Sequence, residues 1–207
     1  MKNLKFICTV ICTGMCLAGV EPLFADVPNI YTLTFDDLTA GSPTPPVPNG
    51  YYGFSWNNWD VIDGSAYVGG YKAGVVSGPN VIFAPYGDPS SIVRQDYFNL
   101  ISAYMTAAWT EGLQLEVKGL RDTSVLYDNV YTLSASAHTL LNFNFTGINE
   151  VDFQVVGTPS QYVMDNLVVG IVPEPTTMAL GLASLSIWFL FTLESRRTKH
   201  ANISVEL

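Results

Sequence analysis

Residues 141–145 read LNFNF and residues 151–155 read VDFQV, and these two stretches decide the fold class. Apolar and polar residues alternate in both, so every second side chain points to the same face, as in a β-strand with one buried side. The same alternation occurs at residues 31–35 (YTLTF) and 113–117 (LQLEV). Further strands are expected at 53–59, 67–71, 80–83, 98–106, 125–133 and 161–170. About ten short strands separated by Gly, Pro, Asn and Asp predict an all-β fold, an antiparallel jelly-roll-like β-sandwich.

The start of the chain has the pattern of an export signal. Lys2 and Lys5 precede an apolar stretch at residues 6–20, and small residues suited to cleavage follow it. We therefore expect residues 1–25 to be a signal peptide, with a retained N-terminal anchor as the alternative. All three cysteines lie in this segment, so the exported domain, residues 26–171, is expected to contain no disulfide.

The other end of the chain combines a proline motif, an apolar run and a basic cluster. Residues 176–193 contain no charged side chain and would span about 27 Å as a helix, enough to cross a bilayer core. Excess basic charge after this run predicts that the end of the chain lies in the cytoplasm. The flanking motif residues are Val172, Pro173, Glu174 and Pro175 before the run, and Arg196 and Arg197 after it.

This arrangement resembles the PEP-CTERM sorting signal. In that family an exosortase in the inner membrane of exopolysaccharide-producing Gram-negative bacteria recognises and removes the tail. The resemblance covers residues 172–200; Glu194 interrupts the basic cluster, and residues 201–207 form an additional short cytoplasmic tail. It implies two partners, an exosortase-like enzyme and, transiently, the inner membrane. An ordinary C-terminal membrane anchor is the alternative.

Charge narrows the function of the exported part. Residues 26–172 hold 14 Asp and Glu against four Lys and Arg, a net charge near −10, although the whole chain carries −9. Such a surface repels phosphates, which excludes nucleic acid as a partner. It is compatible with cations and with neutral sugars.

The acidic residues do not form a convincing catalytic pair. Residues 150–154 (EVDFQ) nearly match the Glu-x-Asp-x-Glu strand of laminarinase-like jelly-roll glycosidases, but Gln154 stands where the general acid would be. His138 is the only histidine in the exported part, and no Gly-x-Ser-x-Gly motif is present. We therefore expect a protein that is not an enzyme. A glycan-active enzyme on a jelly-roll fold is the alternative.

The exported part as a whole resembles domains found ahead of PEP-CTERM tails, with the general look of galactose-binding-like jelly rolls. The matching stretches are residues 35–38 (FDDL), 50–58 (GYYGFSWNN) and 164–167 (MDNL). In such sandwiches a structural calcium often joins the first and last strands. The resemblance implies Asp36, Asp37 and Asp165 as its ligands, because calcium binds carboxylate oxygens. The alternative is that Asp36 and Asp37 cap a turn and that Asp165 and Asn166 form a bulge.

A sugar-binding site needs flat aromatic faces with amide or carboxylate groups beside them. The aromatic segment at residues 51–60 supplies this mixture, and the candidates are Tyr52, Trp56, Asn58 and Trp59. Trp59 has the opposite parity to Trp56 and is expected to be the more exposed of the two. Packing in the core is the alternative for both tryptophans, and Trp109 at a strand end is similarly ambiguous.

These observations predict an exported cell-surface or exopolysaccharide-matrix protein of a Gram-negative bacterium. Its non-catalytic domain is expected to associate with carbohydrate, with the exopolysaccharide as a possible partner. A purely structural surface or adhesion protein is a further alternative.

Overall fold

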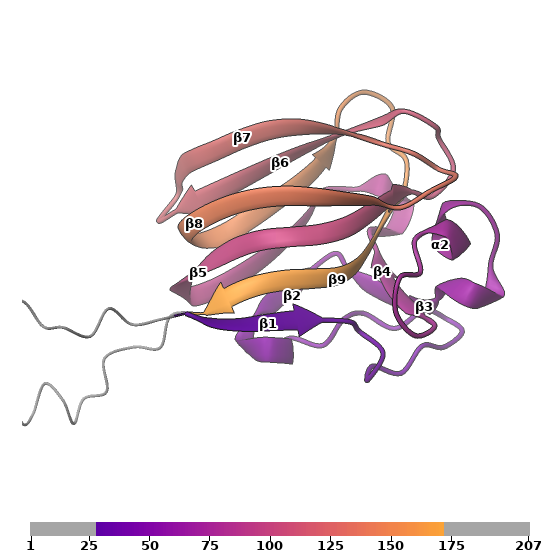
Figure 1. Ribbon diagram of the computed structural model, residues 1–207, viewed down its shortest axis with the longest axis horizontal. Helices are drawn as coiled ribbons and strands as arrows, with labels where there is room; N and C mark the ends of the chain where they lie inside the picture. Colours follow the sequence, from indigo (N-terminus) through magenta and orange to yellow (C-terminus); the bar gives the residue numbers. More distant parts are fainter. Residues whose placement is uncertain (1–27, 172–207) are drawn as a thin grey trace, which may run out of the picture. The chain divides into compact units, whose positions relative to one another are not determined.

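The computed structural model describes residues 28–171, and this part of the chain is built almost entirely from β-strands (Figure 1). The strands are β1 (Asn29–Leu33), β2 (Ser55–Asn57), β3 (Asp60–Asp63), β4 (Asn80–Phe83), β5 (Ser90–Ala107), β6 (Leu113–Arg121), β7 (Ser124–Leu133), β8 (Thr139–Val155) and β9 (Tyr162–Ile171). The helical pieces are short: η1 (Tyr51–Gly53), η2 (Gly64–Ala66), α2 (Gly70–Ala73) and η3 (Pro85–Gly87). The predicted all-β class is confirmed.

All strand pairs are antiparallel, and the strands join in one continuous sheet. Its order is β3-β4-β9-β5-β8-β6-β7, with β1 paired to β9 and β2 paired to β5. The two stretches with the clearest alternation, 141–145 and 151–155, lie in the same strand, β8. Strands β5 and β8 are therefore longer than the sequence pattern suggests, and the other strands are arranged around them.

The sheet folds back on itself because β5 and β8 bend. Tyr162 is paired with Ala107, the last residue of β5, yet its hydroxyl lies 2.7 Å from Oγ of Ser90, the first residue of β5. A straight strand of 18 residues would separate these two ends by about 56 Å. Shifts of register between Val93 and Ser102 mark where β5 turns. Bulges of this kind let one strand serve two layers.

Two layers result, each named here by its strands. The front layer consists of β3, β4, β1, β9, residues 98–107 of β5 and residues 139–148 of β8. The back layer consists of β2, residues 90–93 of β5, residues 150–155 of β8, β6 and β7.

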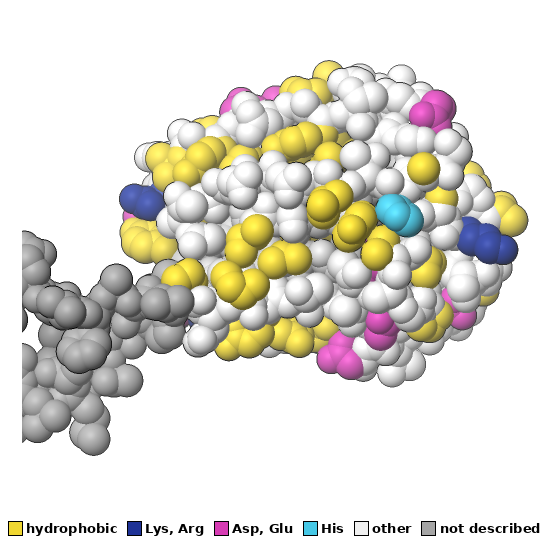
Figure 2. All heavy atoms as spheres, in the orientation of Figure 1, with side chains coloured by type: hydrophobic (Ala, Val, Ile, Leu, Met, Phe, Trp, Pro, Cys, Tyr) yellow, Lys and Arg dark blue, Asp and Glu magenta, His cyan; other side chains and the backbone are white. Residues whose placement is uncertain are grey.

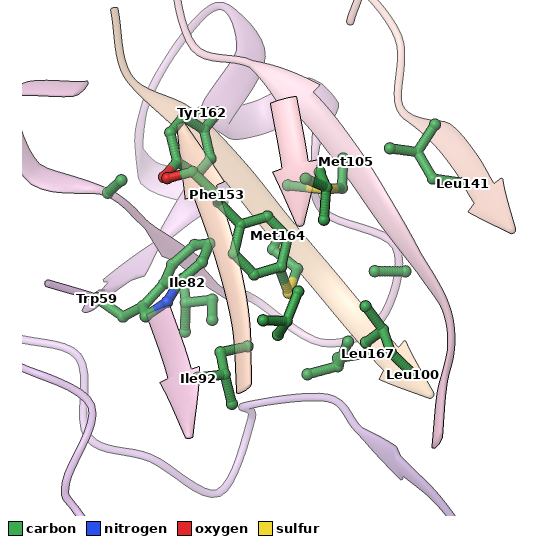
Figure 3. Packing of buried hydrophobic residues seen from close by; sticks show 14 of the residues in the cluster. Trp59, Ile82, Ile92, Leu100, Met105, Leu141, Phe153, Tyr162, Met164 and Leu167 are labelled. Carbon is green, nitrogen blue, oxygen red and sulfur yellow. The ribbon is translucent and has the colours of Figure 1, made fainter. Parts of the chain in front are cut away.

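The apolar faces of the two layers meet in one core. Trp59, Phe153 and Tyr162 lie at its centre, with the indole of Trp59 edge-on to the other two rings at centroid distances of 5.4 and 5.6 Å (Figure 3). Phe153 comes from the back-layer part of β8 and Tyr162 from β9 of the front layer. This contact is therefore made across the two layers.

A polar network fixes the corner where the long strands turn. The guanidinium of Arg121 lies 5.0 Å from the ring centre of Tyr97, and its Nε donates to the carbonyl of Gly147. The Tyr97 hydroxyl donates to Oδ2 of Asp122 at 2.6 Å, and Asn149 donates to Oδ1 of the same carboxylate. Side-chain hydrogen bonds thus replace backbone hydrogen bonds where the regular strand ladder is interrupted.

The proline-rich residues 41–49 belong to the domain. The amide of Val47 donates to the carbonyl of Trp59, and the amide of Val61 donates to the carbonyl of Pro45. Val47 is 2% exposed and part of the core. This extended segment is therefore packed along β3 as a loop of the same domain.

The described part of the chain begins and ends side by side. Asn29 at the start of β1 is paired with Ile171 at the end of β9. Within residues 28–171 no helix is both long and apolar enough to cross a membrane. The predicted signal peptide (1–25), and the sorting signal with its helix at 176–193, fall outside the described residues, so those predictions stay open.

Removal of the Tyr162 hydroxyl tests the contact between the layers. Tyr162→Phe keeps the ring but leaves Oγ of Ser90 and the carbonyl of Phe153 without this partner in a buried site. We expect the free energy of unfolding to fall by about 1–2 kcal/mol. Urea denaturation followed by fluorescence measures the change. Tyr86→Phe is the control, because Tyr86 is 83% exposed; equal stabilities of the two variants would contradict the assigned role.

Candidate functional site

The structure places Trp56 and Trp59 in the core, which corrects their prediction as sugar-binding residues. Trp59 is 1% exposed and Trp56 is 5% exposed, and Nε1 of Trp56 donates to the carbonyl of Tyr51. The parity argument failed at Asn58, whose φ of 55° puts a left-handed residue between β2 and β3. This residue reverses the alternation, so both indoles point inward.

The other two predicted sugar-binding residues are at the surface, but they differ in what they can offer. The amide of Asn58 donates to the carbonyls of Asp88 and Pro89, so it holds the loop before β5. Tyr52 is 40% exposed and edge-on to Tyr31 at 5.8 Å. Of the predicted set, Tyr52 alone presents an aromatic ring to solvent.

A second group of aromatic side chains forms a platform at the opposite end of β9. Trp109 follows β5 and is 56% exposed, yet its Nε1 donates to Oε1 of Gln161 at 2.8 Å. Its ring is edge-on to Tyr71 at 5.4 Å, and the Tyr71 hydroxyl donates to the same Gln161 oxygen. Tyr67 is 45% exposed, and its ring centroid lies 5.8 Å from that of Tyr71. We call Tyr67, Tyr71 and Trp109 the aromatic platform.

Two glycines allow the platform to assemble. The amide of Gly70 donates to the carbonyl of Ala108, and a Cβ on Gly70 would lie 1.7 Å from the carbonyl oxygen of Ala107. Gly69 has a φ of +66° and lies against the ring of Trp109. Only glycine permits this close approach and this backbone conformation. Helix α2 can therefore rest directly on the end of β5, with Tyr71 beneath Trp109.

Buried apolar side chains support α2 from below. Ile62, Val81, Phe83, Ala108 and Val163 form a separate apolar cluster with Tyr71. Burial raises the pKa of Tyr71, so its hydroxyl stays protonated and remains a donor to Gln161. The ring orientation of Trp109 is thus fixed by a buried neighbour and by one amide group.

A hollow of about 380 Å³ opens beside Tyr67. Asp63 brings a carboxylate to it, and Oδ1 of this side chain accepts hydrogen bonds from the amide and hydroxyl of Ser65. Its other lining residues are Leu38, Ala40, Gly41, Ile62 and Asn80. An aromatic face next to a carboxylate is an arrangement that suits a polyhydroxylated ligand.

The predicted calcium ligands are only partly brought together. Asp36 and Asp165 meet at Ser77, whose hydroxyl donates to Asp36 and whose amide donates to Oδ2 of Asp165. Asp37 points elsewhere and accepts a hydrogen bond from Tyr51, which corrects its place in the set. Among the described residues, no group of three or more His, Cys, Asp or Glu is arranged to hold a metal ion.

The contacts of Asp165 are those of a clamp on a loop. This carboxylate is fully buried, and it accepts from the amides of Val76, Ser77 and Asn166 at 2.7, 3.0 and 2.7 Å. Burial raises its pKa, and the negative charge of Asp36 adds to the rise. Oxygens that already face N–H donors are poor candidates for coordinating a cation.

The residues weighed for catalysis lie apart from the platform. Glu150 and Asp152 are on the outer surface of the back layer, where burial raises the pKa of each carboxyl and their mutual contact raises that of Glu150 further. Neither lines the hollow. His138 lies on the front layer, with Nδ1 2.9 Å from the carbonyl oxygen of Ala73 and its ring edge-on to Tyr104.

Sequence reasoning noted Trp109 without selecting it, and it missed Tyr67. A strand-like period was expected over residues 67–71, but these residues form a turn and the start of α2. The signal that could have located the platform was the pair Gly69-Gly70 beside two tyrosines, which indicates a close approach of backbone under aromatic rings.

Neither a protein-family model nor a curated protein matches the chain. Among solved structures, the CBM22-1 xylan-binding domain of Paenibacillus barcinonensis Xyn10C is 12% identical, with a TM-score of 0.44 over 72% of this chain and 98% of that chain. The C-terminal family 22 carbohydrate binding module of Clostridium thermocellum Xyn10B is 9% identical, with a TM-score of 0.41 over 73% and 97%. The K1 cleaved adhesin domain of Lys-gingipain from Porphyromonas gingivalis W83 is 6% identical, with a TM-score of 0.42 over 69% and 98%. Likenesses this distant identify neither a ligand nor an activity.

Substitution of Asp165 tests the loop clamp. Asp165→Asn cannot accept from all three amides, and we expect a loss of about 2 kcal/mol in the free energy of unfolding. Because the native pKa is raised, the stability contributed by protonated Asp165 is fully present below its ordinary pKa of 3.8 and is lost as pH rises through the native pKa. The loss relative to wild type is therefore expected to be larger near about pH 3 than near about pH 7, by urea denaturation; a loss that grows with pH would contradict this.

Chelation tests whether a cation joins Asp36 and Asp165. Since the oxygens of Asp165 are occupied by amide donors, we expect EDTA and added calcium to leave the melting temperature unchanged. Differential scanning calorimetry measures it. A rise with calcium that disappears in Asp36→Asn would show instead that the predicted metal site exists.

Proposed function

We propose that residues 28–171 form a non-catalytic carbohydrate-binding domain of the jelly-roll-like sandwich type. Sugar rings would stack on Trp109 and Tyr67 of the aromatic platform, with the Asp63 carboxylate beside them accepting hydrogen bonds from hydroxyl groups. The observation that carries the proposal is the exposed but fixed indole of Trp109.

An indole left in water is unfavourable, by about 25 cal/mol for each Å² of apolar surface that remains uncovered. Here 56% of Trp109 stays exposed, although its Nε1 is held by Gln161 and its edge by Tyr71. A ring that is already ordered loses little conformational entropy when a ligand covers it. The apolar C–H face of a pyranose ring is a suitable cover, because it matches the flat apolar face of an indole.

The platform also has polar partners for the rim of a sugar ring. Asp63 reaches the hollow beside Tyr67, and Thr110 and Ser160 place hydroxyl groups 3.0 Å from each other next to Trp109 and Gln161. Carboxylate and hydroxyl groups around an aromatic face are the elements by which a site orients a carbohydrate.

We further propose that this domain is exported and sorted to the cell surface or to the exopolysaccharide matrix of a Gram-negative bacterium. The signal-peptide pattern at residues 1–25 and the PEP-CTERM resemblance at residues 172–200 support this route. An exosortase-like enzyme would process the precursor while it is held in the inner membrane. Mass spectrometry of the mature protein tests the proposal, because it shows where each end is cut; an intact C-terminus would contradict the processing step.

Truncation of Trp109 tests the platform. We expect Trp109→Ala to weaken binding of a neutral hexasaccharide by about 10-fold or more, since loss of a central aromatic anchor typically costs about 2 kcal/mol. A glycan array first identifies the sugar among xylo-, cello- and galacto-oligosaccharides, and isothermal titration calorimetry then measures the affinity.

Tyr52→Ala is the matched control, because Tyr52 is also exposed but lies beside Tyr31, near the other end of β9. Its affinity is expected to equal that of wild type. If Tyr52→Ala abolishes binding while Trp109→Ala does not, the aromatic segment predicted from sequence is the site and the platform is not.

A further inference from the structure

Four segments of the front layer together have an outer surface without exposed Asp, Glu, Lys or Arg: β1, β9, residues 98–107 of β5 and residues 139–148 of β8. Strand β3 of the same layer lies outside this surface and carries the half-buried Asp60 and Asp63. Asp165 is the one charged residue in these four segments, and it is 0% exposed beneath the Val76 and Ser77 amides. In Figure 2 the surface over these strands shows polar and apolar atoms, with acidic and basic side chains at its margins. We call this surface the uncharged face.

The back layer is the opposite in character. Its outer surface carries Glu116, Lys118, Asp128, Glu150 and Asp152. Lys118 lies 2.6 Å from Glu116 and 4.0 Å from Asp128. The outer surface of the back layer therefore carries four carboxylates and one lysine, whereas the four segments of the uncharged face expose none.

The basic residues of the described part are largely committed elsewhere. Arg94 pairs with Asp96 and donates to the carbonyl of Tyr52, and Arg121 donates to Gly147. Lys118 is held by its acidic neighbours. Lys72 in α2 is the fourth basic residue. A polyanionic ligand would meet a surface near −10 with few cations to bind it.

The uncharged face has the chemistry of a neutral hydroxyl-rich ligand. Asn142, Ser102, Val168 and Thr32 form one row across β8, β5, β9 and β1, as the strand registers show; Asn142 and Thr32 are exposed, whereas Ser102 is 8% exposed. The next row contains Leu140, which is 45% exposed, and Tyr104 beside it. Amide and hydroxyl groups can bond sugar hydroxyls, while the apolar side chains cover C–H faces.

This face continues into the aromatic platform. Strand β5 runs from Ser102 through Tyr104 to its end, and Trp109 follows two residues later. Helix α2 contacts both regions: Tyr71 packs under Trp109, and the Ala73 carbonyl oxygen lies 2.9 Å from Nδ1 of His138, whose ring touches Tyr104. A chain bound at the platform can therefore extend over the uncharged face.

We propose that the ligand is an uncharged polysaccharide whose chain starts on the aromatic platform and continues along the uncharged face. This inference rests on the proposed carbohydrate-binding function and deepens it, since it assigns the ligand's charge class and a second contact region. Acidic glycans such as uronate polymers are excluded as ligands by the charge of the domain. A disaccharide is long enough to contact only the platform.

The test uses oligosaccharides of two and six residues from the neutral series that binds, with hexagalacturonate as the acidic probe. Asn142→Arg places a bulky side chain on the uncharged face, and Gln154→Arg places the same side chain on the outer surface of the same strand in the back layer. Isothermal titration calorimetry on the full mature protein measures each affinity. Circular dichroism shows that both variants are folded.

We expect Asn142→Arg to weaken hexasaccharide binding by about 10-fold while the disaccharide affinity stays unchanged, and Gln154→Arg to alter neither. Hexagalacturonate is expected to bind at least about 100-fold more weakly than the neutral hexasaccharide. Equal binding of the acidic and neutral hexasaccharides, or an Asn142→Arg variant that binds like wild type, overturns the inference.

The outcomes separate this inference from the proposed function. If Trp109→Ala loses binding and Asn142→Arg keeps it, the platform stands and the extended site does not. If Asn142→Arg loses hexasaccharide binding and Trp109→Ala keeps it, the platform assignment fails. If sedimentation shows a dimer that Asn142→Arg dissociates, the uncharged face is an interface between copies of this chain, which also overturns the inference.

Discussion

The rest of the structure depends on one constraint. Strands β5 and β8 must bury their apolar side, and there is no second, separate sheet among the described residues to cover it. They do so by bending, so that the front and back parts of the same strands face each other across the core. The hydroxyl of Tyr162 bonds Ser90 although its own backbone is paired with Ala107, at the far end of β5. Once these two strands are folded over, the positions of the remaining strands follow from pairing.

The same constraint sets the position of the candidate site. Because β9 lies beside β5 along the front layer, its first residue is next to Gln161 and its last is paired with the start of β1. A ten-residue strand covers about 30 Å. The aromatic platform is therefore about 30 Å from the point where the described chain ends.

Alternation in the sequence predicts the fold class well because it records which side of each strand is buried. It does not record where a strand bends. Only the structure therefore shows that the two alternating stretches of β8 belong to one strand and that β5 is so long. The same limit explains Trp59: a single left-handed residue, Asn58, reverses parity without any change in composition. Asp36 and Asp165 both contact Ser77, because β1 and β9 are neighbours, whereas Asp37 points elsewhere. The aromatic platform was not found, because Trp109, Tyr71 and Gln161 meet only through the packing of α2 on β5.

The distribution of charge follows from the way the domain is folded, and it restricts what the site can bind. Strands β6 and β7 and the back-layer part of β8 carry exposed charges, whereas the one carboxylate of β1, β9 and the front-layer parts of β5 and β8, that of Asp165, is buried under a loop. Desolvating a charged group on binding costs several kcal/mol unless a partner replaces its water. A face built from amides, hydroxyls and apolar groups avoids that cost with a neutral hydroxyl-rich chain.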